Sequence, residues 1–199
     1  MKIAAIIVAA GQSSRFGDGN KLLAAVNGKP LIRHAIEAAL LSPLDDVVVV
    51  TRAGAAELIA AAGDGKWRSV VNDKPEGGLS SSIQCGLAML DPSTDGALVL
   101  LADMPRVTRA HIMQLCSAFA ANNGLAIVYP QSPEGRQGNP VLWPRNLFDD
   151  LMQLRGDVGG KAILTAHPEL HHPVIISDDG IFADIDTASD IDLSAPISD

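Results

Sequence analysis

Aromatic residues and cysteines are scarce in this chain of 199 residues. Only 4% of the residues are aromatic although 47% are hydrophobic, so small and aliphatic side chains must fill the core. The length suits one domain. The two cysteines, Cys85 and Cys116, cannot form a disulfide framework and lack the spacing of a metal site. A reducing cytoplasm is therefore the compartment that we expect.

The sequence also lacks a long apolar run and an excess of positive charge. A membrane-spanning helix needs about 20 apolar residues, and no run approaches that length. The net charge of −8 argues against a nucleic-acid surface. The first residues also suit a short secretory signal, but the β-branched run 3–8 is better explained as a core strand.

Neither of the two commonest phosphate-binding loops is present. Gly11 and Gly17 are separated by five residues and Asp18 follows, which does not match a Walker A loop. The dinucleotide-binding motif fails because Leu22 stands where its third glycine should be. The five histidines show no metal-ligand spacing, and no Ser/His/Asp or Cys/His arrangement can be read from the chain.

What the sequence does contain is a regular alternation of apolar strands and helices. The predicted strands are residues 3–8, 47–51, 69–71, 97–101 and 125–129. The predicted helices between them are residues 30–41, 55–62, 80–90 and a helix that runs from the cap Thr108 to about residue 122. Strands that are apolar throughout indicate a parallel sheet covered on both faces. The fold class is therefore a doubly wound α/β domain, in which ligands bind beyond the carboxyl ends of the strands.

The last third of the chain is less regular. Residues 132–143 are rich in glycine, proline and polar residues and are predicted to form an excursion that faces the substrate. Helices are expected over residues 145–154, 160–166 and 187–193, with Thr187 as the cap of the last one, and a strand over 173–177. No domain boundary is evident, so we predict a single domain over residues 1–199.

The loop after the first strand has the composition of a polyphosphate site. It combines small residues, hydroxyls and two glycines with Arg15, and Lys21 follows. Glycine lets the backbone approach a ligand closely, and consecutive backbone N–H groups form an anion-binding concavity. Arg15 and Lys21 match phosphate oxygens. The alternative is an ordinary connection from strand to helix.

Carboxylates follow at later points where a metal would complete such a site. Asp103 leaves the buried strand 97–101, and Asp184 and Asp186 lie two residues apart further on. Carboxylates together with substrate phosphates are the usual ligands of Mg²⁺. The alternatives are a turn residue for Asp103 and a helix cap for Asp186, although Thr187 is the more natural cap.

Three more glycine-containing loops are candidates for binding. A glycine pair followed by three serines, residues 77–82, opens a predicted helix and offers donors to a base, a ribose or a phosphate, unless the serines only cap the helix. Residues 135–140 and 155–161 each combine glycines with a cation, which suggests a second anionic ligand. Both segments could also be plain surface connections.

In this order, these motifs resemble those of the MobA-like nucleotidyltransferases, and most closely the molybdenum cofactor cytidylyltransferase branch. The motifs that carry the resemblance are Ala9-Ala10-Gly11, Arg15, Lys21, Asp103-Met104-Pro105, Gly138-Asn139-Pro140, Gly156–Gly160 and Asp184-Ile185-Asp186-Thr187. The resemblance implies a single, mostly parallel, Rossmann-like (GT-A-like) domain. It also implies a cytoplasmic enzyme that moves CMP from CTP to the terminal phosphate of molybdopterin and releases pyrophosphate. Contact with a recipient molybdoenzyme is expected, without nucleic-acid or membrane partners.

The resemblance also assigns roles to single residues. Arg15 and Lys21 would neutralise the triphosphate, and Asp103 and Asp186 would hold Mg²⁺, with Mn²⁺ as an alternative. The remaining nucleotide contacts would be Ala9, Ala10, Gly11, Ser13, Ser14, Gly78, Ser81 and Ser82. The acceptor contacts would be Gly138, Asn139, Asp157 and Gly159. Residues 1–130 would thus mainly bind the nucleotide, and residues 131–199 would bind the acceptor and supply the second metal ligand.

Other functions fit the same motifs. The base assignment depends on Ala10, where guanylyltransferases usually carry glycine, so a guanylyltransferase for the same cofactor is one alternative. A cytidylyltransferase acting on a sugar or polyol phosphate is another. A non-catalytic carrier of the molybdenum cofactor belongs to a different class, and it would not need two separate metal carboxylates.

Overall fold

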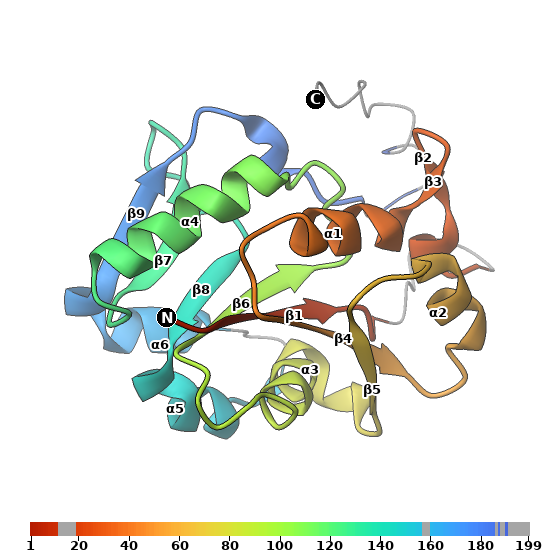
Figure 1. Ribbon diagram of the computed structural model, residues 1–199, viewed down its shortest axis with the longest axis horizontal. Coiled ribbons are helices and arrows are strands. Elements are labelled where there is room, and N and C mark those ends of the chain that lie inside the picture. The colour runs from red at the N-terminus through yellow and green to blue at the C-terminus, as the bar shows by residue number, and fades with distance from the viewer. Residues whose placement is uncertain (12–18, 157–159, 186, 188–189, 191–199) are drawn as a thin grey trace.

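A mixed seven-stranded sheet with helices on both faces forms the centre of the protein (Figure 1). The structure is a computed structural model, and it describes residues 1–11, 19–156, 160–185, 187 and 190. The strand order is β5-β4-β1-β6-β8-β7-β9. The strands are β1 (Ile3–Val8), β4 (Asp46–Arg52), β5 (Arg68–Asn72), β6 (Gly96–Leu101), β7 (Ile127–Gln131), β8 (Val141–Pro144) and β9 (His171–Ile175).

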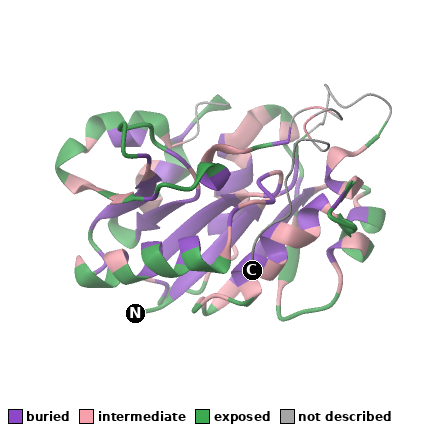
Figure 2. Ribbon diagram, turned by 90° about the horizontal axis from the view of Figure 1, so that it is seen from above, coloured by how far each residue is buried: buried purple, intermediate pink, exposed green. Residues whose placement is uncertain are grey.

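Two hydrophobic cores, one on each face, hold the helices to the sheet. The helices are α1 (Leu31–Leu40), α2 (Ala56–Ala62), α3 (Gly78–Leu87), α4 (Arg109–Ala121), α5 (Phe148–Gln153) and α6 (Lys161–Ala166). The first core joins the sheet to α1, α2 and α4, and the second joins it to α3, α5 and α6. Ile7 faces the first core and Ile6 the second, because successive side chains of a strand point to opposite faces. The prediction of a sheet covered on both faces is therefore confirmed, as the buried strands in Figure 2 show.

Short elements connect this framework. A small antiparallel hairpin of β2 (Ala25–Val26) and β3 (Lys29–Pro30) precedes α1. The 3₁₀ turns are η1 (Lys21–Leu23), η2 (Pro75–Gly77), η3 (Arg145–Leu147), η5 (Pro168–Leu170) and η6 (Asp179–Phe182). Thr108 caps α4 as predicted, since its Oγ1 accepts a hydrogen bond from the amide of His111.

Strand β8 differs from the sequence-based expectation. Residues 132–143 were expected to be irregular, yet Val141 to Trp143 enter the sheet, antiparallel to both β6 and β7. The remaining strand pairs are parallel, which confirms the mostly parallel fold class. Because β8 runs the opposite way, the residues just before it lie at the edge where the parallel strands end.

One predicted helix also differs, and another is largely untested. Residues 145–154 form the turn η3 and then the short helix α5 instead of one helix. Most of the helix predicted over 187–193 lies outside the described residues. Within the described part of the chain, no helix is both long and apolar enough to cross a membrane.

Candidate active site

Two of the predicted site residues form an ion pair at the carboxyl ends of β1 and β6. The Nζ atom of Lys21 lies 2.7 Å from Oδ2 of Asp103, although the residues are 82 positions apart in the sequence. The two strands are parallel neighbours with Val8 opposite Leu101, so the loops that follow them start side by side. The side chains are only 13% and 22% exposed, so water screens this pair only in part.

The second carboxylate oxygen of Asp103 is buried and has no hydrogen-bond partner among the described residues. Oδ1 accepts no hydrogen bond from the described residues, and leaving a buried acceptor unpaired costs about 1–3 kcal/mol. Hard divalent cations prefer carboxylate oxygens as ligands. The atom therefore fits the role of a cation ligand, as predicted for Asp103.

The predicted second ligand, Asp186, lies outside the described residues, but its chain neighbour does not. The amide of Ile185 donates a hydrogen bond of 3.0 Å to the backbone oxygen of Asp103. The segment that leads to Asp186 therefore passes directly beside Asp103. No cluster of three or more metal-ligand side chains occurs among the described residues.

A small cavity lies around the ion pair. Its described lining consists of Val8, Ala9, Gly11, Lys21, Leu22, Leu101 and Asp103. Its volume of about 100 Å³ is below the 300–1,000 Å³ of typical small-molecule sites. The described walls therefore enclose only part of a ligand, and a phosphate group is the part that suits a lysine and glycine backbone.

The first loop is described only at its beginning. Gly11 borders the cavity and has open space where a side chain would stand. Ala10 is buried and packs into the core on the α3 face of the sheet. The predicted phosphate ligands Ser13, Ser14 and Arg15 lie outside the described residues, so their roles stay predictions.

The predicted base and ribose contacts lie at the start of α3 and are fixed by a residue that the sequence analysis missed. Asn72, at the end of β5, donates through Nδ2 to the hydroxyls of Ser81 (2.9 Å) and Ser82 (3.1 Å). Ser81 in turn donates to the carbonyl of Gly78, which has a φ of +67° that favours glycine. In the sequence, Asn72 stands out only as a polar residue that follows the predicted strand 69–71.

The predicted acceptor contacts lie at the same sheet edge because β8 is antiparallel. The amide of Gly138 donates to the carbonyl of Pro130 (2.8 Å), and that of Asn139 donates to the carbonyl of Ile181 (3.1 Å). A Cβ atom on Gly138 would lie 2.8 Å from the Ile181 oxygen, so this close approach requires glycine. Asp157 and Gly159 lie outside the described residues.

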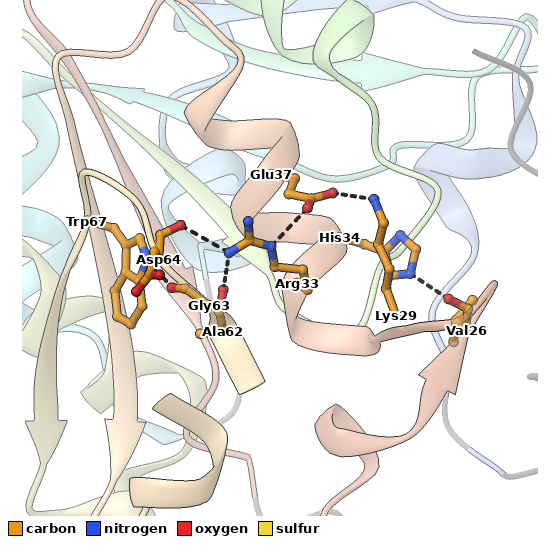
Figure 3. Close-up of polar contacts among 9 residues, drawn as sticks. All are labelled: Val26, Lys29, Arg33, His34, Glu37, Ala62, Gly63, Asp64 and Trp67. Carbon is orange, nitrogen blue, oxygen red and sulfur yellow. Dashed lines mark hydrogen bonds and ion pairs between the residues drawn. The ribbon is translucent and has the colours of Figure 1, made fainter. Parts of the chain in front are cut away.

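A polar network joins α1 to the β2–β3 hairpin and to the end of α2 (Figure 3). Glu37 of α1 accepts hydrogen bonds from Lys29 (2.7 Å) and Arg33 (2.8 Å), and Arg33 also donates to the carbonyl of Ala62 at the end of α2. The hydrogen bond from Lys29 and then that from Arg33 hold the pKa of Glu37 below its usual value, although burial opposes them.

The same helix holds the hairpin between Lys21 and α1. Nε2 of His34 is hydrogen-bonded to the carbonyl of Val26 in β2 (2.9 Å), and the amide of Leu31 donates to the carbonyl of Ala24 (2.9 Å). Turn η1 with Lys21 directly precedes this hairpin. Helix α1 therefore fixes the backbone from which Lys21 reaches Asp103.

The domain is thus a mostly parallel α/β sheet with a lysine, a carboxylate and a glycine at adjoining strand ends. The sequence matches the MobA-like NTP transferase domain family over residues 5–172, and the chain belongs to that family. This confirms the resemblance to the family and the nucleotidyltransferase class that were predicted from the motifs.

Individual relatives are more distant. The chain is 28% identical over 189 residues to the nicotine blue oxidoreductase of Paenarthrobacter nicotinovorans, a match that covers 93% of this chain and 92% of that protein. It is 39% identical over 101 residues to a probable molybdenum cofactor guanylyltransferase of Natronomonas pharaonis, covering 50% of this chain and 48% of that one.

Solved structures share the fold. The protein Rv0371c of Mycobacterium tuberculosis H37Rv, in a complex with manganese, is 22% identical and superposes with a TM-score of 0.80 over 97% of both chains. At this identity the similarity concerns the fold alone. It confirms the predicted single Rossmann-like domain.

Proposed function

We propose that the protein transfers CMP from CTP to the terminal phosphate of molybdopterin, which yields molybdopterin cytosine dinucleotide and pyrophosphate. The observation that carries the proposal is the Lys21–Asp103 pair beside residues 8–11, with Oδ1 of Asp103 buried and without a partner among the described residues. A cation and a carboxylate at this sheet edge are what a triphosphate and its counter-ion need.

The reaction requires positioning more than proton transfer. A phosphate monoester has its second pKa near ~6, so the acceptor is already a nucleophile at neutral pH. An oxygen of this phosphate forms the new bond to the α-phosphorus, and the bond from that phosphorus to the bridging oxygen breaks. The electron pair leaves with pyrophosphate. No general base is needed, and the described lining of the cavity contains no histidine.

In this reaction, the side chains would stabilise the negative charge of the phosphates. Lys21, held 2.7 Å from Asp103, would contact the α-phosphate and stabilise the negative charge that grows there. Arg15 would bind the departing phosphates. Asp103, with Asp186, would hold a divalent cation, Mg²⁺ or alternatively Mn²⁺. When bound, such a cation neutralises charge on the triphosphate.

The choice of CTP depends on Ala10, which is 4% exposed. Guanylyltransferases for the same cofactor usually carry glycine at this position, and the alanine of this chain supports the cytidine assignment. Ser81 and Ser82, oriented by Asn72, would contact the base and ribose. We place the reaction in the cytoplasm, with a recipient molybdoenzyme as the partner that takes the product.

The test is incubation of the purified protein with molybdopterin, Mg²⁺ and labelled CTP or GTP, followed by chromatography of the dinucleotide. Product from CTP and not from GTP is expected. Product from GTP alone would overturn the base assignment. Binding of molybdopterin without pyrophosphate release would indicate a carrier, and consumption of a nicotinamide cofactor would indicate an oxidoreductase.

A further inference from the structure

The turn between β7 and β8 presents one arginine on an aromatic ring. Cζ of Arg136 lies 4.3 Å from the centre of the Phe182 ring. The turn is closed by hydrogen bonds in both directions, from the Ser132 amide to the Arg136 carbonyl (2.9 Å) and from the Arg136 amide to Ser132 Oγ (3.2 Å). A bridge between Gln131 and Gln137 pairs the two arms. The backbone that carries the guanidinium is therefore held in place.

The ring is held equally well. Phe182 ends η6, and Asp178 caps this turn by accepting from the amide of Gly180 (2.6 Å). The carboxylate of Asp178 also faces Arg106 at 3.8 Å and the buried His111 at 3.6 Å, which ties η6 to the start of α4. These contacts hold the backbone turn that carries the Phe182 ring.

The contact with the ring leaves the N–H groups of Arg136 available, as far as the described residues show. The residue is exposed, and its guanidinium makes no hydrogen bond or ion pair with the residues that the structure describes. Glu134 shares the turn, but its carboxylate pairs with Ser132, which lowers the pKa of Glu134. A guanidinium over an aromatic ring still presents its planar N–H fork, which matches phosphate oxygens in a bidentate manner.

The backbone segment 181–185 connects Arg136 to the candidate active site. Ile181, beside Phe182, accepts from the amide of Asn139, and Ile185 donates to the backbone of Asp103. Arg136 therefore stands at the edge of the sheet that carries Asp103, on the side that β8 supplies. The chain has a net charge of −8, which repels anions overall. Arg136, which has no ion-pair partner among the described residues, attracts an anion locally at this edge.

We propose that Arg136, placed over the ring of Phe182, is the specificity-determining contact for the phosphate monoester of the acceptor. That the bound phosphate belongs to the acceptor rests on the proposed function. That Arg136 binds an anion rests on its position over Phe182. Loss of one charge-assisted contact corresponds to about a 10- to 100-fold weaker interaction.

The test uses Arg136→Gln and Phe182→Leu, with Arg145→Gln as the matched control. Arg145 lies at the opposite end of β8, where its guanidinium is 5.7 Å from the centre of the Phe148 ring and donates to the carbonyl of Thr94. Arg136→Gln is expected to raise KM for molybdopterin about tenfold or more and to leave KM for CTP and the melting temperature unchanged. Phe182→Leu should change the same constant by a smaller factor, and Arg145→Gln should leave it unchanged.

A second readout does not depend on turnover. Inorganic phosphate is titrated into ¹⁵N-labelled protein while the arginine Nε–Hε signals are followed by NMR, with Arg136→Gln identifying its signal. A saturable shift of the Arg136 signal that exceeds any shift of the Arg145 signal is expected. If the protein forms no dinucleotide, the proposed function fails while this titration still decides on the anion site. Equal shifts of the two signals, or an unchanged KM for molybdopterin in an active Arg136→Gln, would overturn the inference.

Discussion

Replacing Asp103 by alanine should slow turnover strongly and change stability little. The substitution removes the ion pair with Lys21, whose Nζ lies 2.7 Å from Oδ2, and it also removes the buried Oδ1 that lacks a partner. These two losses act in opposite directions on the free energy of unfolding. Turnover and the free energy of unfolding should therefore respond differently to this substitution.

The two contributions are of similar size. Exposed ion pairs are worth about 0.2–1 kcal/mol and breaking buried ones costs about 3–5 kcal/mol. With side chains 13% and 22% exposed, this pair falls between these limits, at about 1–3 kcal/mol. Removing the unpartnered oxygen recovers about 1–3 kcal/mol. The net change should stay within about 2 kcal/mol, whereas loss of an electrostatic contact in the transition state slows turnover about 10²–10³-fold.

The assay combines pyrophosphate release from CTP and molybdopterin with urea unfolding of the same samples. Asp95→Ala is the control, because Asp95 precedes β6 at the opposite edge of the sheet and its carboxylate accepts from the amide of Lys2 (2.7 Å). It should keep full turnover. Turnover of Asp103→Ala within twofold of the native enzyme would refute the role of Asp103. A loss of stability above about 4 kcal/mol would refute the energetic argument for Oδ1.

Three further predictions concern the framework. Gly86→Ala should lower the free energy of unfolding by roughly 1–3 kcal/mol, because the new Cβ would lie 2.3 Å from Cγ2 of Ile6; equal urea midpoints would contradict this. The hydrogen bond from Lys29 holds the pKa of Glu37 below 4.5, so the carboxylate stabilises the fold above that pH and loses its effect as the pH falls further. The stability difference between the native chain and Glu37→Gln should accordingly shrink in acid, and a constant difference in urea titrations would argue against it. Burial, with a smaller effect of a nearby carboxylate, raises the pKa of Cys116 to about 11, so its thiol should resist alkylation at pH 8 until urea unfolds the chain, as mass spectrometry would show.

Continuous apolar runs made the central strands predictable. Strands β1, β4 and β6 are buried on both faces, and such strands carry apolar residues at every position instead of every second one. The start of α4 was equally evident from Thr108, because a threonine that caps a helix bonds within its own turn. These features depend on neighbouring residues, which the sequence displays directly.

Strand β8 was not predictable by the same means. Val141–Pro144 is four residues long, ends in proline and follows a stretch rich in glycine and polar residues. It is a strand because β6 and β7 lie on either side and satisfy its backbone. Its reversed direction, which brings Gly138 and Asn139 to the functional edge, likewise depends on partners far away in the chain.

By itself, the sequence determined the alternation of strands and helices and the family, because these follow from local pattern and from motifs. Only the tertiary structure decided which of the charged residues meet. Lys21 reaches Asp103 because β1 and β6 are parallel neighbours, with Val8 opposite Leu101. Arg136 lies on Phe182 because the turn before β8 packs against η6. Strand order and register set such distances, and neither can be read from residues that are adjacent in the chain.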